Sequence, residues 1–65
     1  MEHFWGVYFG TDKSWRMGQR LFNTLNLTNQ DLANEIRGTR LDPFYNNSAE
    51  ENLDFVGWLT EKLGE

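Results

Sequence analysis

The chain contains no cysteine, and in a protein of 65 residues this absence limits how a stable fold can be built. A chain this short buries only about 60% of the surface that it exposes when unfolded, so small domains often depend on disulfides, metals or subunit association. Disulfides and thiolate metal sites are excluded. The one histidine, His3, lies beside a chain end, so we expect no metal either. An aromatic core or a partner subunit must supply the stability.

Aromatic residues are unusually frequent and favour the first of these routes. They make up 15% of the chain, as three Trp, five Phe and two Tyr. Aromatic side chains bury large areas and are scarce in disordered chains. We therefore predict one small folded domain spanning residues 1–65.

Residues 3–9, "HFWGVYF", alternate in a way that suits a strand, with His3, Trp5, Val7 and Phe9 on one side. We predict an extended or β segment over residues 1–10. A lone strand cannot satisfy its backbone groups, and residues 39–45 offer only a weak partner. The alternatives are a sheet shared by two chains, which would make a homo-oligomer, or a segment laid across the helices.

Three helices are expected after this segment. Apolar spacing predicts a helix over 15–25, capped by Asp12 or Ser14 and ended by Asn26 in the left-handed conformation. Its buried stripe is Trp15, Gly18, Leu21, Phe22 and Leu25.

The second helix is predicted over 29–37. Thr28 is the expected N-cap, and Leu27 and Leu32 have the spacing of a hydrophobic staple. Gly38 is the expected residue just past the C-terminus.

The third helix is predicted over 49–63, with Ser48 and Glu51 forming a capping box. Phe55 flanks its apolar face, and Trp58 projects toward the other side. The apolar face comprises Ala49, Leu53, Val56, Leu59 and Leu63. The expected fold is therefore mainly α: a three-helix domain with an N-terminal extended or β segment.

Between the last two helices, Asp42-Pro43 prevents helix propagation, and we expect Leu41 and Phe44 to anchor the loop. Arg37 and Arg40 could pair there with Asp42 or Glu35. The aromatic residues exceed what one small core must need, and interfaces favour Tyr, Trp and Arg. Packing in a single core remains the alternative. The candidate protein contacts are Arg40, Phe44, Tyr45 and Trp58.

The residue pattern does not favour catalysis. Ser14 and Ser48 are explained as helix caps, no phosphate-binding glycine loop is present, and the one histidine is terminal. We predict a non-enzymatic protein without cofactor or metal that binds another protein. One alternative is a nucleic-acid binder, although a net charge of −4 opposes it. Its contacts would be Lys13, Arg16, Arg20, Arg37 and Arg40. A weaker alternative is an acidic mimic of nucleic acid using Glu50, Glu51, Asp54 and Glu61.

Two motifs, "GQ-x-x-x-N-x-L" at residues 18–25 and "GT-x-x-DPFY" at residues 38–45, resemble small proteins of tailed bacteriophages and prophages. The similarity covers roughly residues 15–59. It implies an accessory phage product made in the bacterial cytoplasm, and no activity or catalytic residue carries over from it. The protein partner predicted above would then be of phage or host origin. No apolar run is long enough for a membrane span, and "MEHFWGVYFG" lacks the positive charge of a signal peptide.

Overall fold

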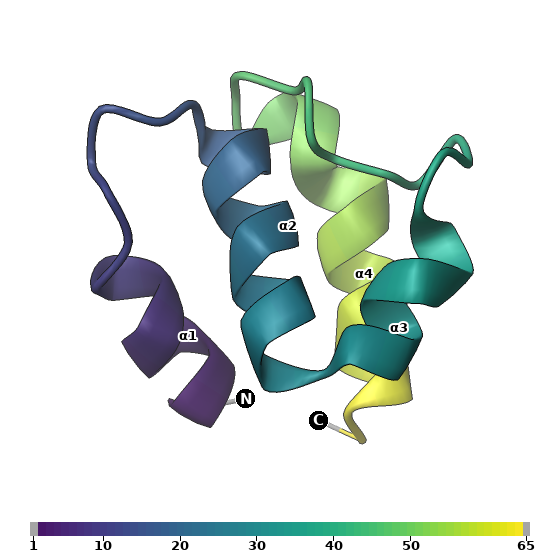
Figure 1. Ribbon diagram of the computed structural model, residues 1–65. Helices are drawn as coiled ribbons and strands as arrows, with labels where there is room; N and C mark the ends of the chain where they lie inside the picture. Colours follow the sequence, from purple (N-terminus) through teal and green to yellow (C-terminus); the bar gives the residue numbers. More distant parts are fainter. Residues whose placement is uncertain (1, 65) are drawn as a thin grey trace.

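The protein is built from helices joined by short loops, in a computed structural model that describes residues 2–64. Its elements are α1 (Glu2–Phe9), α2 (Met17–Thr28), α3 (Gln30–Ile36), the 3-10 turn η1 (Glu50–Asn52) and α4 (Leu53–Lys62). Helix α2 lies between α1 on one side and α3 and α4 on the other (Figure 1). The predicted mainly α fold is confirmed. None of the helices within residues 2–64 is long and apolar enough to cross a membrane.

All four helices contribute to one hydrophobic core around α2. Leu21 and Leu25 of α2 and Leu59 of α4 are fully buried, and half-buried side chains such as Trp5 and Trp58 pack around them. The remaining core residues are Phe4, Tyr8, Phe22, Ala33, Ile36 and Phe55. The aromatic residues thus serve largely as core, which is how this chain manages without disulfides.

The predicted N-terminal strand is wrong, because residues 2–9 form helix α1 and no strand occurs within residues 2–64. Met1, the first residue of the predicted segment, lies outside the described residues. Phe4 and Tyr8 are four residues apart and therefore share one face of a helix, where both are buried. The alternation placed Phe9 on the same side as Trp5, whereas in the helix Phe9 is 64% exposed and Trp5 is half-buried. A helix satisfies its own backbone groups, so α1 needs no partner strand.

Helix α2 begins and ends later than predicted. Trp15 precedes the helix and is partly exposed, while Asp12 accepts hydrogen bonds from Ser14 in the preceding turn instead of capping α2. Asn26 lies inside the helix, and no residue other than glycine in 2–64 has a positive φ.

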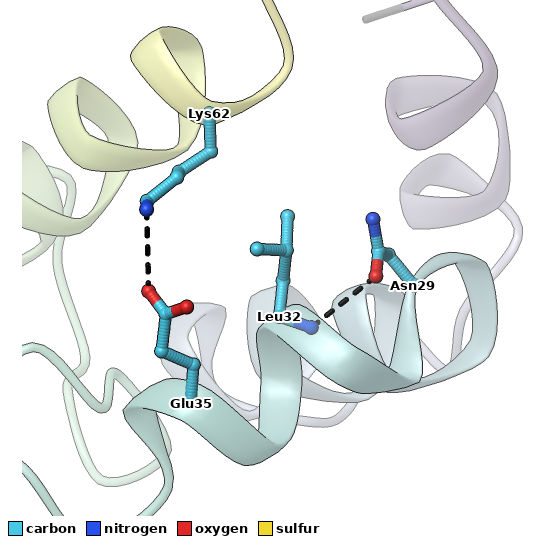
Figure 2. Close-up of polar contacts among 4 residues, drawn as sticks. All are labelled: Asn29, Leu32, Glu35 and Lys62. Atoms are coloured by element: carbon cyan, nitrogen blue, oxygen red, sulfur yellow. Dashed lines mark hydrogen bonds and ion pairs between the residues drawn. The ribbon is translucent and has the colours of Figure 1, made fainter.

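A sharp corner at Asn29 joins α2 to α3. Its backbone N–H donates to the Leu25 carbonyl, and its side-chain oxygen accepts from Leu32 N at 3.2 Å (Figure 2). Asn29 therefore replaces Thr28 as the N-cap. The predicted staple is absent, since Leu27 is 74% exposed. Lys62 of α4 forms an ion pair with Glu35 of α3 at 3.5 Å, also shown in Figure 2.

The last helix starts with the predicted capping box. Glu51 N donates to Ser48 Oγ, and Ser48 N donates to Glu51 Oε1. The first turn is the 3-10 turn η1, and α4 follows. The predicted apolar face is rotated: Leu53 is 65% exposed, whereas Phe55, expected at its edge, is buried.

Candidate protein-contact site

Residues 37–49, here called the connector, join α3 to η1 and hold the strongest sequence motif. Gly38 has φ +77°, as predicted for a glycine just past a helix. The Asp42 carboxylate accepts backbone N–H groups from Gly38 at 2.8 Å and from Phe44 at 3.0 Å. Within residues 2–64, Glu35 forms its ion pair with Lys62, and Arg37 Nη2 donates to Asn34 Oδ1 at 3.3 Å. Asp42 stabilises the turn by binding the backbone at both of its ends.

Gly18 allows the connector to rest directly on the first turn of α2. Its N–H donates to the Asn46 carbonyl at 2.9 Å, so the connector satisfies one of the free N–H groups at this helix end. A Cβ atom at residue 18 would overlap the Pro43 carbonyl oxygen and lie 2.7 Å from that of Asn46. The glycine in the "GQ" motif thus has a structural reason: only a hydrogen fits between the two backbones.

A polar network fixes the other end of the connector to η1. Asn52 is fully buried, and it accepts from Asn46 Nδ2 at 3.1 Å and donates to the Ser48 carbonyl at 2.8 Å. Glu51 accepts from Asn47 N at 2.8 Å. This hydrogen bond, with those from Ser48, lowers the pKa of the Glu51 carboxyl below its ordinary value. Both ends of the connector are therefore held by hydrogen bonds.

Arg16 binds the aromatic pair at the centre of the connector. Its Nε donates to the Phe44 carbonyl at 3.0 Å, and its guanidinium lies 5.6 Å from the Phe44 ring centroid and 5.4 Å from that of Tyr45. Phe44 meets Phe22 of the core edge-on at 5.9 Å. Phe44 therefore anchors the connector, as predicted, while Tyr45 remains 79% exposed.

The four predicted protein contacts come from two parts of the chain, the connector and α4. Phe44 and Tyr45 lie together, with ring centroids 5.1 Å apart. Arg40 is exposed on the same connector. Trp58 belongs to α4, where its half-buried ring lies 6.1 Å from that of Phe55. Tyr45 is the member of this set with the most open aromatic surface.

The residues predicted for nucleic-acid contact are mostly engaged within the fold. Arg20 donates to Thr11 Oγ1 and covers the Tyr8 ring at 4.3 Å. Lys13 donates to the Phe9 carbonyl, and Arg37 lies over Phe22 at 5.0 Å. Arg16 holds the connector, as described above. Among residues 2–64, only Arg40 of the five has no such contact.

The residues predicted for an acidic mimic of nucleic acid lie on η1 and α4. Glu50, Asp54 and Glu61 are exposed, while Glu51 belongs to the capping box. The described part of the chain contains no group of three His, Cys, Asp or Glu side chains that could hold a metal ion.

Sequence reasoning missed two residues that position this site. Arg16 was expected only as a possible nucleic-acid contact, and its hydrogen bond to the Phe44 carbonyl joins residues 28 positions apart, which no local pattern predicts. Asn52 was not named as a candidate. Its burial depends on the 3-10 geometry of η1, and no local sequence pattern predicts that geometry.

The comparisons with known proteins add no relative: no family model matches the chain, and neither does a curated protein or a solved structure.

Proposed function

We propose that this chain is a non-enzymatic accessory protein of a bacteriophage or prophage and that it binds another protein, of phage or host origin, through Tyr45. The observation that carries the proposal is a tyrosine ring, 79% exposed, on a connector held at both ends by hydrogen bonds. The phage context comes from the resemblance of residues 15–59.

The geometry around Tyr45 suits a binding surface. Tyrosine has few rotatable bonds and combines apolar area with a polar tip, so it loses little entropy when a partner covers it. The Arg16 guanidinium lies 5.4 Å from the centroid of the Tyr45 ring. Arg40 adds an exposed guanidinium on the same connector. Tyr and Arg are the residue types that most often dominate interface energies.

No observation favours nucleic-acid binding as a second function. Four of the five candidate cations contact backbone or aromatic groups of the fold. The net charge of −4 also repels phosphate backbones.

Capture from a bacterial lysate tests the proposal, with the wild-type chain and Tyr45→Ala as baits. We expect a stoichiometric protein with the wild type and its loss with Tyr45→Ala. Leu53→Ala is the matched control, because Leu53 is a similarly exposed apolar residue on α4. Both variants should keep the melting temperature of the wild type. Equal capture by Tyr45→Ala, or no partner at all, contradicts the proposal.

A further inference from the structure

A groove lies between α1 and α2, on a part of the surface that the connector does not use. It has a volume of about 540 Å³, which is within the range of ligand sites. Its lining includes Gly6, Asp12, Trp15, Asn26 and Leu27. The fold does not require the glycine, because a Cβ at Gly6 would meet nothing within 4 Å. The wall of the groove at α1 is therefore open.

Two side-chain oxygens of the residues that line the groove, on Asn26 and Asp12, accept no hydrogen bond within residues 2–64. Asn26 Oδ1 is buried and has no hydrogen-bond partner within residues 2–64. The oxygen is covered in the free protein, and rotation about χ2 of asparagine is soft enough to present it to the groove, where a ligand N–H can reach it. Asp12 uses Oδ1 to accept from Ser14 and has no bond to Oδ2 in the described chain.

Charge and ring chemistry narrow the class of ligand. Among residues 2–64, Asp12 is the one charged residue that lines the groove. Arg20 is near enough to offset part of its charge, but the Nε and Nη2 donors of Arg20 are directed to Thr11 Oγ1 and the Tyr8 carbonyl. Trp15 is 36% exposed, and no ring or cation contact to its indole occurs within residues 2–64.

We propose that the groove binds an arginine side chain of the protein partner. Asp12 and Asn26 accept its N–H groups, and the Trp15 indole lies against the guanidinium plane. Arginine fits better than lysine because its planar fork of donors can both pair with a carboxylate and stack on an aromatic ring. This inference rests on the proposed function, since it names the chemistry of the partner.

Titration of the ¹⁵N-labelled protein with N-acetyl-arginine amide tests the site. We expect saturable shifts of the Trp15 indole N–H and the Asn26 side-chain amide. N-acetyl-citrulline amide has the shape of the arginine probe without its charge, and N-acetyl-lysine amide has the charge without the planar fork. Each should bind with a dissociation constant roughly 3-fold or more above that of the arginine probe. Equal affinity for the citrulline probe, or no saturable shift at these two groups, overturns the proposal. Tighter binding of free L-arginine than of the blocked probe overturns the assignment to a protein side chain.

Variants with matched charge complete the test. Asp12→Asn keeps an oxygen that can accept from Ser14 and should weaken the arginine probe roughly 3- to 5-fold. Asp31→Asn removes the same charge at an exposed position in the first turn of α3 and should have no effect. Equal weakening by both variants overturns the local role of Asp12. Probe binding and lysate capture can fail independently. If the probe does not bind but capture depends on Tyr45, only the groove proposal is overturned. If the probe binds but capture does not depend on Tyr45, only the proposed function of Tyr45 is overturned.

Discussion

The connector and α1 are both held against α2, but by different balances of interaction. The connector is fixed mainly by backbone and side-chain hydrogen bonds, such as Gly18 N to the Asn46 carbonyl, with Phe44 packed on Phe22. Helix α1 is fixed by burial of Phe4 and Tyr8 and by the guanidinium of Arg20 over the Tyr8 ring. Hydrogen bonds require particular atoms at particular places, whereas apolar burial tolerates many arrangements. The connector should therefore respond sharply to small substitutions and α1 should respond mildly.

The largest effect is expected from Gly18→Ala. The added methyl group would overlap the Pro43 carbonyl and force the connector away from α2. It would also disrupt the Gly18–Asn46 hydrogen bond. We expect the free energy of unfolding to fall by about 3 kcal/mol, since overpacking adds to a lost backbone bond. Urea unfolding followed by circular dichroism measures it, and an unchanged midpoint would show that the connector does not rest on α2.

A smaller loss is expected from Phe44→Ala. Phe44 is half-buried and meets Phe22 edge-on, so its truncation should lower the free energy of unfolding by about 2 kcal/mol. The adjacent Tyr45→Ala is the control and should change it by about 0.5 kcal/mol or less, since that ring is exposed. The same urea titration compares them. Similar losses for both would mean that Tyr45, too, is a structural residue.

The same contrast explains how far the sequence could predict the fold. The connector is specified by local chemistry, and its signals were correct: Gly38 as helix stop, Asp42-Pro43 as turn, and Ser48 with Glu51 as capping box. Each of these depends on residues fewer than six positions apart. Phe44 was also correctly expected to anchor the loop.

Helix α1 could not be predicted in this way, because its sequence suits either structure. Alternation over residues 3–9 fits a strand, and the spacing of Phe4 and Tyr8 fits a helix turned toward α2. The deciding contact, Arg20 over Tyr8, joins residues 12 positions apart. For the candidate site, the exposure of Tyr45 likewise depends on Gly18 and Arg16, which are distant in sequence. The residues could be named as candidates, but their arrangement required the tertiary structure.

Gly6→Ala adds the same methyl group as Gly18→Ala, but we expect it to raise the free energy of unfolding instead of lowering it. Gly6 lies in the middle of α1, and a Cβ there meets nothing within 4 Å. Alanine should raise the free energy of unfolding by about 0.5–1 kcal/mol, because glycine lowers helix stability by that amount. The far-ultraviolet circular dichroism signal at 222 nm should not weaken. Destabilisation by Gly6→Ala would contradict both a helical α1 and an open groove at this position.

The smallest effect concerns the capping box and should depend on pH. Hydrogen bonds from Asn47 and Ser48 hold the pKa of Glu51 below its ordinary value of 4.5. A carboxyl whose pKa is lowered by folding stabilises the protein above the unfolded value and loses that contribution as the pH falls through the folded value. Wild type should therefore be more stable than Glu51→Gln at pH 7, and the difference should shrink as the pH falls below 4.5.

Glu50→Gln supplies the matched control for this pH dependence. It removes the same charge from the adjacent residue, also in the first turn of η1, but leaves the hydrogen bonds of Asn47 and Ser48 to Glu51 intact. Melting temperatures of the three proteins between pH 3 and pH 7 make the comparison. A pH-independent gap between wild type and Glu51→Gln, or an equal gap for Glu50→Gln, would mean that the charge of Glu51 does not hold this end of the connector. The connector would then be held by the Asn52 hydrogen bonds at its η1 end and by Gly18 at its α2 end.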